Sequence, residues 1–81
     1  MLKENATTYR RVTRIEHPNA DEIYTVFHLA TGDDEPDEHL SLTPEHVGYI
    51  LQGHHQFDVQ SNTGAYYMPD IINGTLVGVY A

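Results

Sequence analysis

Six histidines are the side chains of this sequence best suited to chemistry, because imidazole binds metal ions and transfers protons near neutral pH. They are His17, His28, His39, His46, His54 and His55. No H-x-H or H-E-x-x-H pattern occurs, so no pair has the spacing of a helical zinc site. The nearest arrangement places Glu38-His39 seven residues before Glu45-His46, which allows a metal site made of His39, His46 and a loop carboxylate. We favour the simpler interpretation that solvent-facing histidines moderate a negative surface, and we expect no metal and no cofactor.

The other common catalytic arrangements are missing from the sequence. Ser41 and Ser61 are the only serines, and neither lies in a G-x-S-x-G elbow. There is no cysteine, no G-x-G-x-x-G loop and no Walker loop. The acidic segment 33–38 offers oxygen ligands to calcium, but it lacks the glycine and glutamate positions of an EF-hand. We therefore expect a protein that is not an enzyme and has no catalytic residues.

The charged residues are distributed very unevenly along the chain. Twelve acids and four bases give a net charge of −8, and all four bases lie within the first 14 residues. Since Glu4 is the one acid in that segment, residues 15–81 carry eleven acids and neither lysine nor arginine. Such a chain is a poor partner for nucleic acid or an anionic membrane and a good partner for a basic protein surface. A solvated surface, adaptation to high salt, or internal ion pairs from Arg10, Arg11 and Arg14 would explain the same charge.

The densest group of carboxylates lies in residues 32–39, which we expect to form an exposed acidic loop, because like charges repel and Pro36 removes a donor. Five carboxylates fall within six residues, so an extended chain carries one charge per about 4 Å. Phosphates along one DNA strand are spaced by about 3.4 Å, and a groove that follows phosphates would meet a similar field here. The predicted partner-binding carboxylates are Asp33, Asp34, Glu35, Asp37 and Glu38.

Tyrosine supplies six of the eight aromatic residues. It is enriched at protein interfaces because it offers apolar area together with a hydroxyl group. Tyr66 and Tyr67 are adjacent, so in a strand one of them must point away from the core. We predict that Tyr66 or Tyr67 takes part in partner binding, whereas Tyr24 and Tyr80 are expected to be core residues with hydroxyl groups at the surface.

Together these features favour a small acidic binding protein that docks on a basic protein surface. The expected partner is a nucleic-acid-handling protein such as a nuclease, which the chain would inhibit as a nucleic-acid mimic. In charge and size the chain is comparable with small inhibitors from phages and mobile elements. One alternative is an accessory or assembly subunit whose acidity serves only solubility or salt adaptation. A third is a metal- or ligand-binding sensor that uses the histidines and carboxylates.

In the N-terminal half, two strands must position these residues. Segments 8–17 and 22–31 are rich in β-forming residues and flank a turn that begins at Pro18, which predicts an antiparallel hairpin. The second segment is apolar on both faces, as expected of a central strand that is covered on both sides. Leu40 and Leu42 then return the chain to the core after the acidic loop.

The C-terminal half is expected to hold one helix and the remaining strands. The helix should run from an N-cap at Thr43 to a left-handed Gly53, and it should dock on the sheet through an apolar stripe. The residues of that stripe are Val47, Ile50 and Leu51. Segments 56–61 and 65–68 suggest two short strands, the second ended by Pro69, and Asn73-Gly74 predicts a type I′ hairpin before a last strand at 75–80. The predicted fold is α+β, with an antiparallel sheet of four to five short strands, one short helix and the order ββαβββ.

At 81 residues, the chain has room for a single domain over residues 1–81, with residues 1–7 frayed. No apolar run approaches the roughly 20 residues of a membrane span, and the absence of cysteine rules out a disulfide framework. We therefore expect a cytoplasmic protein. Crowded carboxylates should repel one another and have raised pKa values, so we expect stability to increase as the pH falls from 7 towards about 5.

Overall fold

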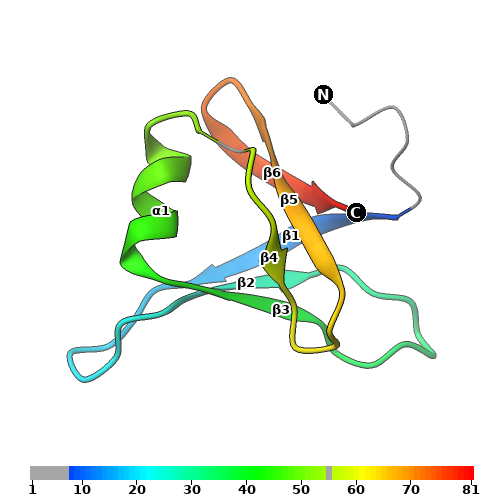
Figure 1. Ribbon diagram of the computed structural model, residues 1–81. Coiled ribbons are helices and arrows are strands. Elements are labelled where there is room, and N and C mark those ends of the chain that lie inside the picture. Colours follow the sequence, from blue (N-terminus) through cyan, green and yellow to red (C-terminus); the bar gives the residue numbers. More distant parts are fainter. Residues whose placement is uncertain (1–7, 55) are drawn as a thin grey trace.

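The computed structural model describes residues 8–54 and 56–81, so the predicted fraying of residues 1–7 lies outside the described residues. The first half is an antiparallel sheet of three strands (Figure 1): β1 (Tyr9–Glu16), β2 (Thr25–Leu29) and β3 (His39–Leu42). The predicted hairpin of the first two strands is confirmed, with Ile15 opposite Phe27. The second strand is shorter than expected, because residues 20–24 form the turn and the approach to the strand.

The helix follows its local signals. Helix α1 (Pro44–Leu51) begins after Thr43, whose hydroxyl accepts a hydrogen bond from the His46 amide at 3.3 Å. Beyond its end, Gly53 has a φ of 86°, as predicted for a left-handed residue at that position. The expected docking stripe is only partly correct. Val47 and Ile50 pack against the core, whereas Leu51 is 81% exposed, because α1 packs mainly on the short strand β3 and Leu51 belongs to its last turn.

The C-terminal half adds three strands: β4 (Val59–Gln60), β5 (Tyr66–Ile72) and β6 (Thr75–Tyr80). Asn73 and Gly74 both have positive φ, at 53° and 78°, which agrees with the predicted type I′ hairpin. Pro69 was expected to end a strand, and this prediction was wrong. Pro69 lies opposite Val79 inside β5, at a position where β4 no longer pairs with β5, so the missing amide proton costs no ladder hydrogen bond.

The six strands form one sheet in the order β3-β2-β1-β6-β5-β4. A bridge between Leu40 and Ser61 joins the two edges, so the sheet is nearly closed into a barrel. The chain is thus an antiparallel α+β domain, as predicted, but it has six strands in the order βββαβββ rather than four to five in the order ββαβββ. The missed strand is β3, where Leu40 and Leu42 alternate with polar residues over only four positions.

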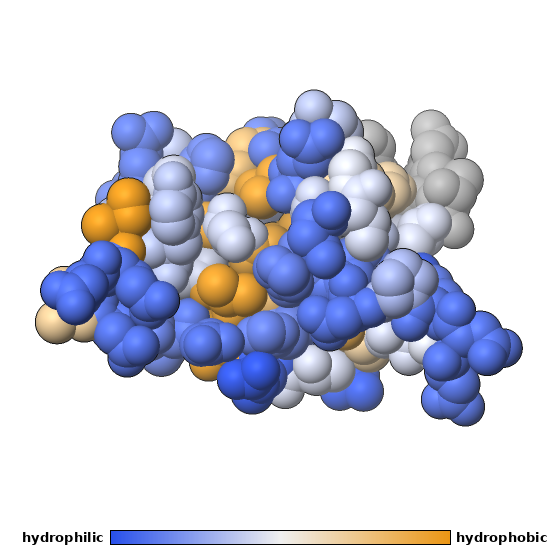
Figure 2. Space-filling view, turned by 90° about the horizontal axis from the view of Figure 1, so that it is seen from below, coloured by the Kyte–Doolittle hydropathy of each residue, from blue (hydrophilic) through white to orange (hydrophobic). Residues whose placement is uncertain are grey.

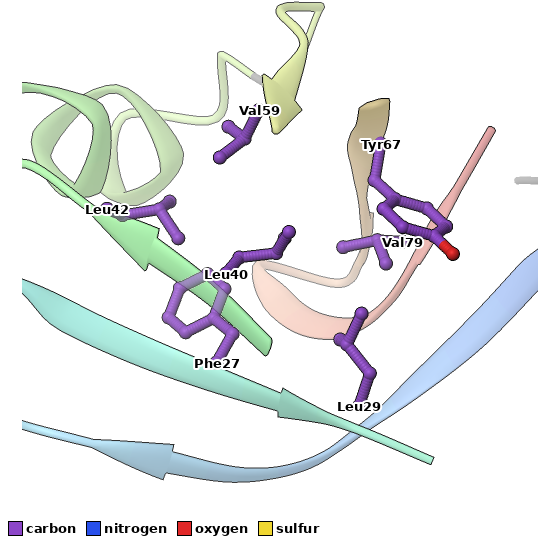
Figure 3. Close-up of a cluster of buried hydrophobic side chains, with 7 residues drawn as sticks. All are labelled: Phe27, Leu29, Leu40, Leu42, Val59, Tyr67 and Val79. Carbon is purple, nitrogen blue, oxygen red and sulfur yellow. The ribbon is translucent and has the colours of Figure 1, made fainter. Parts of the chain in front are cut away.

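The core lies inside this curved sheet, where side chains from five strands converge (Figure 3). Its buried members are Phe27, Leu29, Leu40, Leu42, Val59, Tyr67 and Val79. β2 buries every second residue rather than both faces, so the prediction of a strand covered on both sides was wrong. Tyr80 is 7% exposed, but Tyr24 is 49% exposed and is not a core residue. One face of the β1–β2–β3 sheet therefore remains on the outside.

Candidate functional site

Within the acidic loop, Glu35 is tied to β1 rather than free for a partner. Its carboxylate forms an ion pair with the Arg10 guanidinium and accepts a hydrogen bond from the Gly32 amide at 2.8 Å. The hydrogen bond from Arg10, followed by that from Gly32, lowers the pKa of Glu35 and keeps this exposed side chain charged. Internal ion pairs with the arginines were one alternative explanation of the acidic composition, and the Arg10–Glu35 pair is an ion pair of this kind.

Glu38 is buried, although it was predicted to lie in an exposed loop. Only 5% of the residue is exposed, and its carboxylate accepts hydrogen bonds from Ser61 at 2.9 Å, Thr63 at 2.6 Å and Tyr67 at 3.0 Å. The Nε atom of Arg10 lies 3.6 Å from the same carboxylate. Burial alone would raise the pKa of Glu38, but these hydroxyl groups and the positive charge of Arg10 together lower it. Through these hydrogen bonds the carboxylate connects the start of β3 to the turn between β4 and β5.

The predicted partner-binding residues therefore separate into two sets. Glu38 and Tyr67 contact each other inside the protein, and Tyr67 is 2% exposed, so the expectation that they face a partner is corrected. Tyr66 is the outward member of the tyrosine pair, at 59% exposure. The predicted carboxylates that remain exposed are Asp33, Asp34 and Asp37, and of these Asp37 lies 3.5 Å from the His39 ring. Among the described residues, no hydrogen bond or ion pair joins Tyr66 to them.

A row of histidines and carboxylates crosses the outer face of the β1–β2–β3 sheet. Glu16 Oε1 lies 2.9 Å from His28 Nε2, the His28 and His39 rings are 6.0 Å apart, and His39 Nδ1 lies 3.5 Å from Asp37 Oδ2. The hydrogen bond with His28 is the main cause that lowers the pKa of Glu16, and Arg14 at 3.6 Å adds to it. No group of three or more possible ligands within residues 8–54 and 56–81 is arranged to hold a metal ion, so the alternative site with His39 and His46 gains no support there.

One end of this row opens into a hollow of about 560 Å³ beside the turn between β1 and β2, which we call the tip hollow. Its lining residues are Glu16, His17, Asp21, Glu22, Ile23, Tyr24, Val26 and Ser41. Ile23 is 58% exposed and Tyr24 is 49% exposed, although both are large and apolar. Glu22 holds the turn, because its carboxylate accepts a hydrogen bond from the Asn19 amide at 3.0 Å.

Figure 2 views the molecule from below, the side on which β2 and β3 lie in Figure 1. Most of this surface is hydrophilic, and separate hydrophobic patches interrupt it near the centre and towards the left edge. The tip of the β1–β2 hairpin forms the lower left of Figure 1. The outer sheet face is therefore a mainly polar surface with exposed apolar side chains at the end that holds the tip hollow.

A second hollow, of about 660 Å³, lies beyond the C-terminal end of α1 and is lined in part by Tyr49, Phe57 and His54. Its wall is aromatic: the Phe57 ring stacks on His46 with centroids 5.0 Å apart and meets Tyr49 edge-on at 6.1 Å. No carboxylate, lysine or arginine is among its described lining residues. The tip hollow is smaller, but its lining combines three carboxylates with exposed apolar side chains, so it is the better candidate site for binding a partner.

The sequence did not single out the tip hollow. Glu16, Asp21 and Glu22 lie outside segment 32–39, where the partner-binding carboxylates were predicted, and Tyr24 was predicted to be a core residue. A usable signal was present in Asp21-Glu22-Ile23-Tyr24, where two large apolar residues directly follow a turn and two acids. Residues this close to the turn of a hairpin lie beyond the paired part of the strands, and here both side chains are exposed.

Known proteins offer no guide to this chain. No family model matches it, and neither the curated proteins nor the solved structures contain a significant match. Within the described ranges, no helix is both long and apolar enough to cross a lipid bilayer. The chemistry of the outer sheet face therefore has to be interpreted from its own residues.

Proposed function

We propose that this protein is a non-enzymatic binding protein that docks on a basic surface of a nucleic-acid-handling protein and blocks it. The observation that carries the proposal is the tip hollow, where exposed apolar side chains lie beside three carboxylates. No lysine or arginine is among its described lining residues. Exposed apolar side chains bordered by charges of one sign are typical of surfaces that meet a partner of opposite charge.

The binding surface in this proposal differs from an acidic loop acting alone. Glu35 and Glu38 are occupied by Arg10 and by hydroxyl groups, so the loop offers a partner three carboxylates rather than five. Asp37 contacts His39 in the row on the outer sheet face, and Glu16 links the other end of that row to the tip hollow. A mimic of nucleic acid would therefore use the whole outer sheet face, with the tip hollow as its apolar anchor.

The remaining parts of the proposal follow from this surface. A protein that covers a phosphate-binding surface acts as an inhibitor, in the manner of small phage or mobile-element proteins. The proposed compartment is the cytoplasm, the expectation for a chain without cysteine. The proposal includes no direct contact with nucleic acid, because the acids repel phosphate.

Two charge-matched variants test this function. The tip variant carries Glu16→Gln, Asp21→Asn and Glu22→Gln, and the loop variant carries Asp33→Asn, Asp34→Asn and Asp37→Asn, so each removes three negative charges. Immobilised wild-type protein is exposed to lysate of the organism that encodes it, and captured proteins are identified by mass spectrometry. We expect a captured protein with a basic nucleic-acid-binding surface, and its release by duplex DNA or by RNA.

Binding should weaken steeply as salt increases from 0.05 to 0.3 M, because exposed ionic contacts are screened over a Debye length of about 8 Å at 0.15 M. The tip variant should lose the partner, and the loop variant should retain part of the binding. A partner that stays bound in excess DNA and RNA, or that both variants capture as well as the wild type, would contradict the proposed function. Capture of no specific protein would contradict it as well.

A further inference from the structure

The lining of the tip hollow suggests what kind of side chain it receives. Its volume of about 560 Å³ lies within the range of about 300–1,000 Å³ that is typical of ligand pockets. Ile23 and Val26 provide aliphatic contact, and Tyr24, at 49% exposure, provides an aromatic ring. The hollow can therefore accept a side chain that is apolar along its length.

The carboxylates around the tip hollow determine the charge at the end of that side chain. Glu16 is held by His28 at 2.9 Å, lies 3.6 Å from the exposed Arg14 side chain and has a lowered pKa, so it stays charged at neutral pH. Glu22 is fixed at the turn through the Asn19 amide, and Asp21 stands beside it in the lining. Anchoring of this kind limits the entropy that the carboxylates lose when they bind a cation.

Arginine fits this combination better than lysine. Its guanidinium group is planar, stacks on aromatic rings and donates paired hydrogen bonds to carboxylates, whereas lysine is a compact and strongly hydrated point charge. The methylene groups of arginine would contact Ile23 and Val26 while the guanidinium group meets Tyr24 and the carboxylates. The lining thus matches the apolar stem, the flat face and the charge of one arginine side chain.

We propose that the tip hollow is the anchor pocket for a single arginine side chain presented by a protein partner. This inference rests on the proposed function, and it replaces a diffuse charge attraction with a defined contact. It also predicts selectivity for arginine over lysine, which attraction between net charges alone would not produce.

The test uses the full chain labelled with ¹⁵N and four short peptides of identical sequence except at one central position. That position holds arginine, lysine, citrulline or norleucine, with leucine on one side. Chemical shifts are followed during titration in 0.05 M salt. We expect the arginine peptide to perturb residues 16–26 and Ser41 most strongly, and to bind at least about threefold more tightly than the lysine peptide. The citrulline and norleucine peptides should bind at least about tenfold more weakly, because they lack the charge.

The charge-matched variants and one aromatic variant distinguish binding in the tip hollow from general electrostatic attraction to an acidic protein. The tip variant should weaken binding of the arginine peptide at least about fivefold, while the loop variant should change it by less than about twofold. Tyr24→Ala should remove most of the preference for arginine over lysine, because both cations keep the carboxylates but lose the ring. Each variant is first checked by its own spectrum and melting temperature. Ile23→Ala, which changes no charge, serves as a second probe of the pocket if the tip variant is misfolded.

Equal affinity for the arginine and lysine peptides, or equal weakening by the tip and loop variants, would overturn the anchor pocket. That outcome would leave the proposed function intact if lysate capture and nucleic-acid competition still succeed. If instead the arginine peptide binds in the tip hollow but the lysate yields no nucleic-acid-handling partner, the proposed function fails and the anchor pocket stands. The two experiments therefore fail independently.

Discussion

Acidic segments adjoin both ends of β2, but carboxylates of one segment are paired within the protein and those of the other line an exposed hollow. At the end next to the acidic loop, Glu35 and Glu38 turn towards Arg10 and towards hydroxyl groups of the β4–β5 turn. At the other end, Asp21 and Glu22 line an open hollow beside exposed apolar residues. The denser group of acids in the sequence thus supplies part of the scaffold, and the sparser group forms the candidate binding surface.

This comparison shows that spatial neighbours, rather than the local density of like charge, decide what a carboxylate does. Arg10 on β1 lies next to the loop end because β1 and β2 are paired, and the near closure of the barrel brings the hydroxyl groups of Ser61 and Thr63 to Glu38. At the tip hollow Arg14 lies 3.6 Å from Glu16, but the described lining residues include neither a lysine nor an arginine, and no ion pair among the described residues involves Asp21 or Glu22. The predictions below test this difference, from the largest expected effect to the smallest.

Replacing Glu38 should have the largest effect. Glu38→Ala would remove the acceptor of three hydroxyl groups and the negative charge that lies 3.6 Å from the Arg10 Nε atom, so we expect a loss of about 3 kcal/mol in the free energy of unfolding. Asp37→Ala, one residue earlier in the chain, is the control and should change stability by less than about 0.5 kcal/mol. Urea unfolding followed by circular dichroism measures both variants. Equal stability of the two variants would show that the loop end is not part of the scaffold.

Acidification below about pH 5 should lower stability, whereas repulsion among crowded acids predicted an increase between pH 7 and about 5. The pKa values of Glu16, Glu35 and Glu38 are all lowered in the folded protein. The pKa of glutamate in the unfolded chain is about 4.3, so below this pH the unfolded chain binds more protons than the folded protein does. The stability these groups provide is complete above that value and is lost as the pH falls through the folded pKa values. We expect the free energy of unfolding to fall between pH 5 and pH 3.

Glu38→Gln separates the contribution of the buried carboxylate to this pH dependence. The variant keeps the shape of the side chain but no longer titrates, so its stability should fall less steeply on acidification than that of the wild type. Urea titrations at half-unit pH steps measure both curves. Stability that increases from pH 5 to pH 3 would show that repulsion outweighs these contacts in that range as well. Identical slopes for the two proteins would show that Glu38 takes no part in the pH dependence.

The adjacent tyrosines provide a smaller and closely matched test. Tyr67→Phe removes the hydroxyl group that donates to Glu38 at 3.0 Å, and we expect a loss of about 1 kcal/mol. Tyr66→Phe removes a hydroxyl group from a residue that is 59% exposed, and we expect no measurable change. For a domain of this size, 1 kcal/mol corresponds to a decrease of about 4–8 °C in melting temperature. A Tyr66 variant that melts as low as the Tyr67 variant would contradict the assignment of inner and outer tyrosines.

The features that could be predicted from the sequence depend on neighbouring residues in the chain. The cap at Thr43 and the turn at Asn73-Gly74 are set by local geometry, and both were correctly predicted. The burial of Glu38 depends on Ser61 and Tyr67, which lie 23 and 29 residues away in the sequence. Only the nearly closed sheet brings these groups together. A pattern of charges and turns carries no information about such distant hydroxyl groups, so the acidic loop was expected to be uniformly exposed.

The tip hollow was missed for the opposite reason. Ile23 and Tyr24 fit a strand pattern, and an apolar strand pattern favours burial. Their exposure follows from where the ladder begins, because β2 starts only at Thr25 and leaves both residues beside the turn. Strand boundaries depend on the pairing of β2 with β1 and β3, and the alternation of residue types does not determine them.

The smallest effect is expected when the apolar residues of the tip hollow are changed. Ile23→Ser and Tyr24→Ser should each alter the free energy of unfolding by less than about 0.5 kcal/mol. Both side chains are about half exposed or more, and both residues precede β2. Phe27→Ser, two positions into β2 and 4% exposed, is the positive control and should unfold most of the protein at room temperature. Thermal melts at neutral pH rank the variants. A loss above about 1.5 kcal/mol for either tip variant would mean that Ile23 and Tyr24 belong to the scaffold. The contrast between the two ends of β2 would then disappear, whereas unchanged stability leaves these side chains available for a partner.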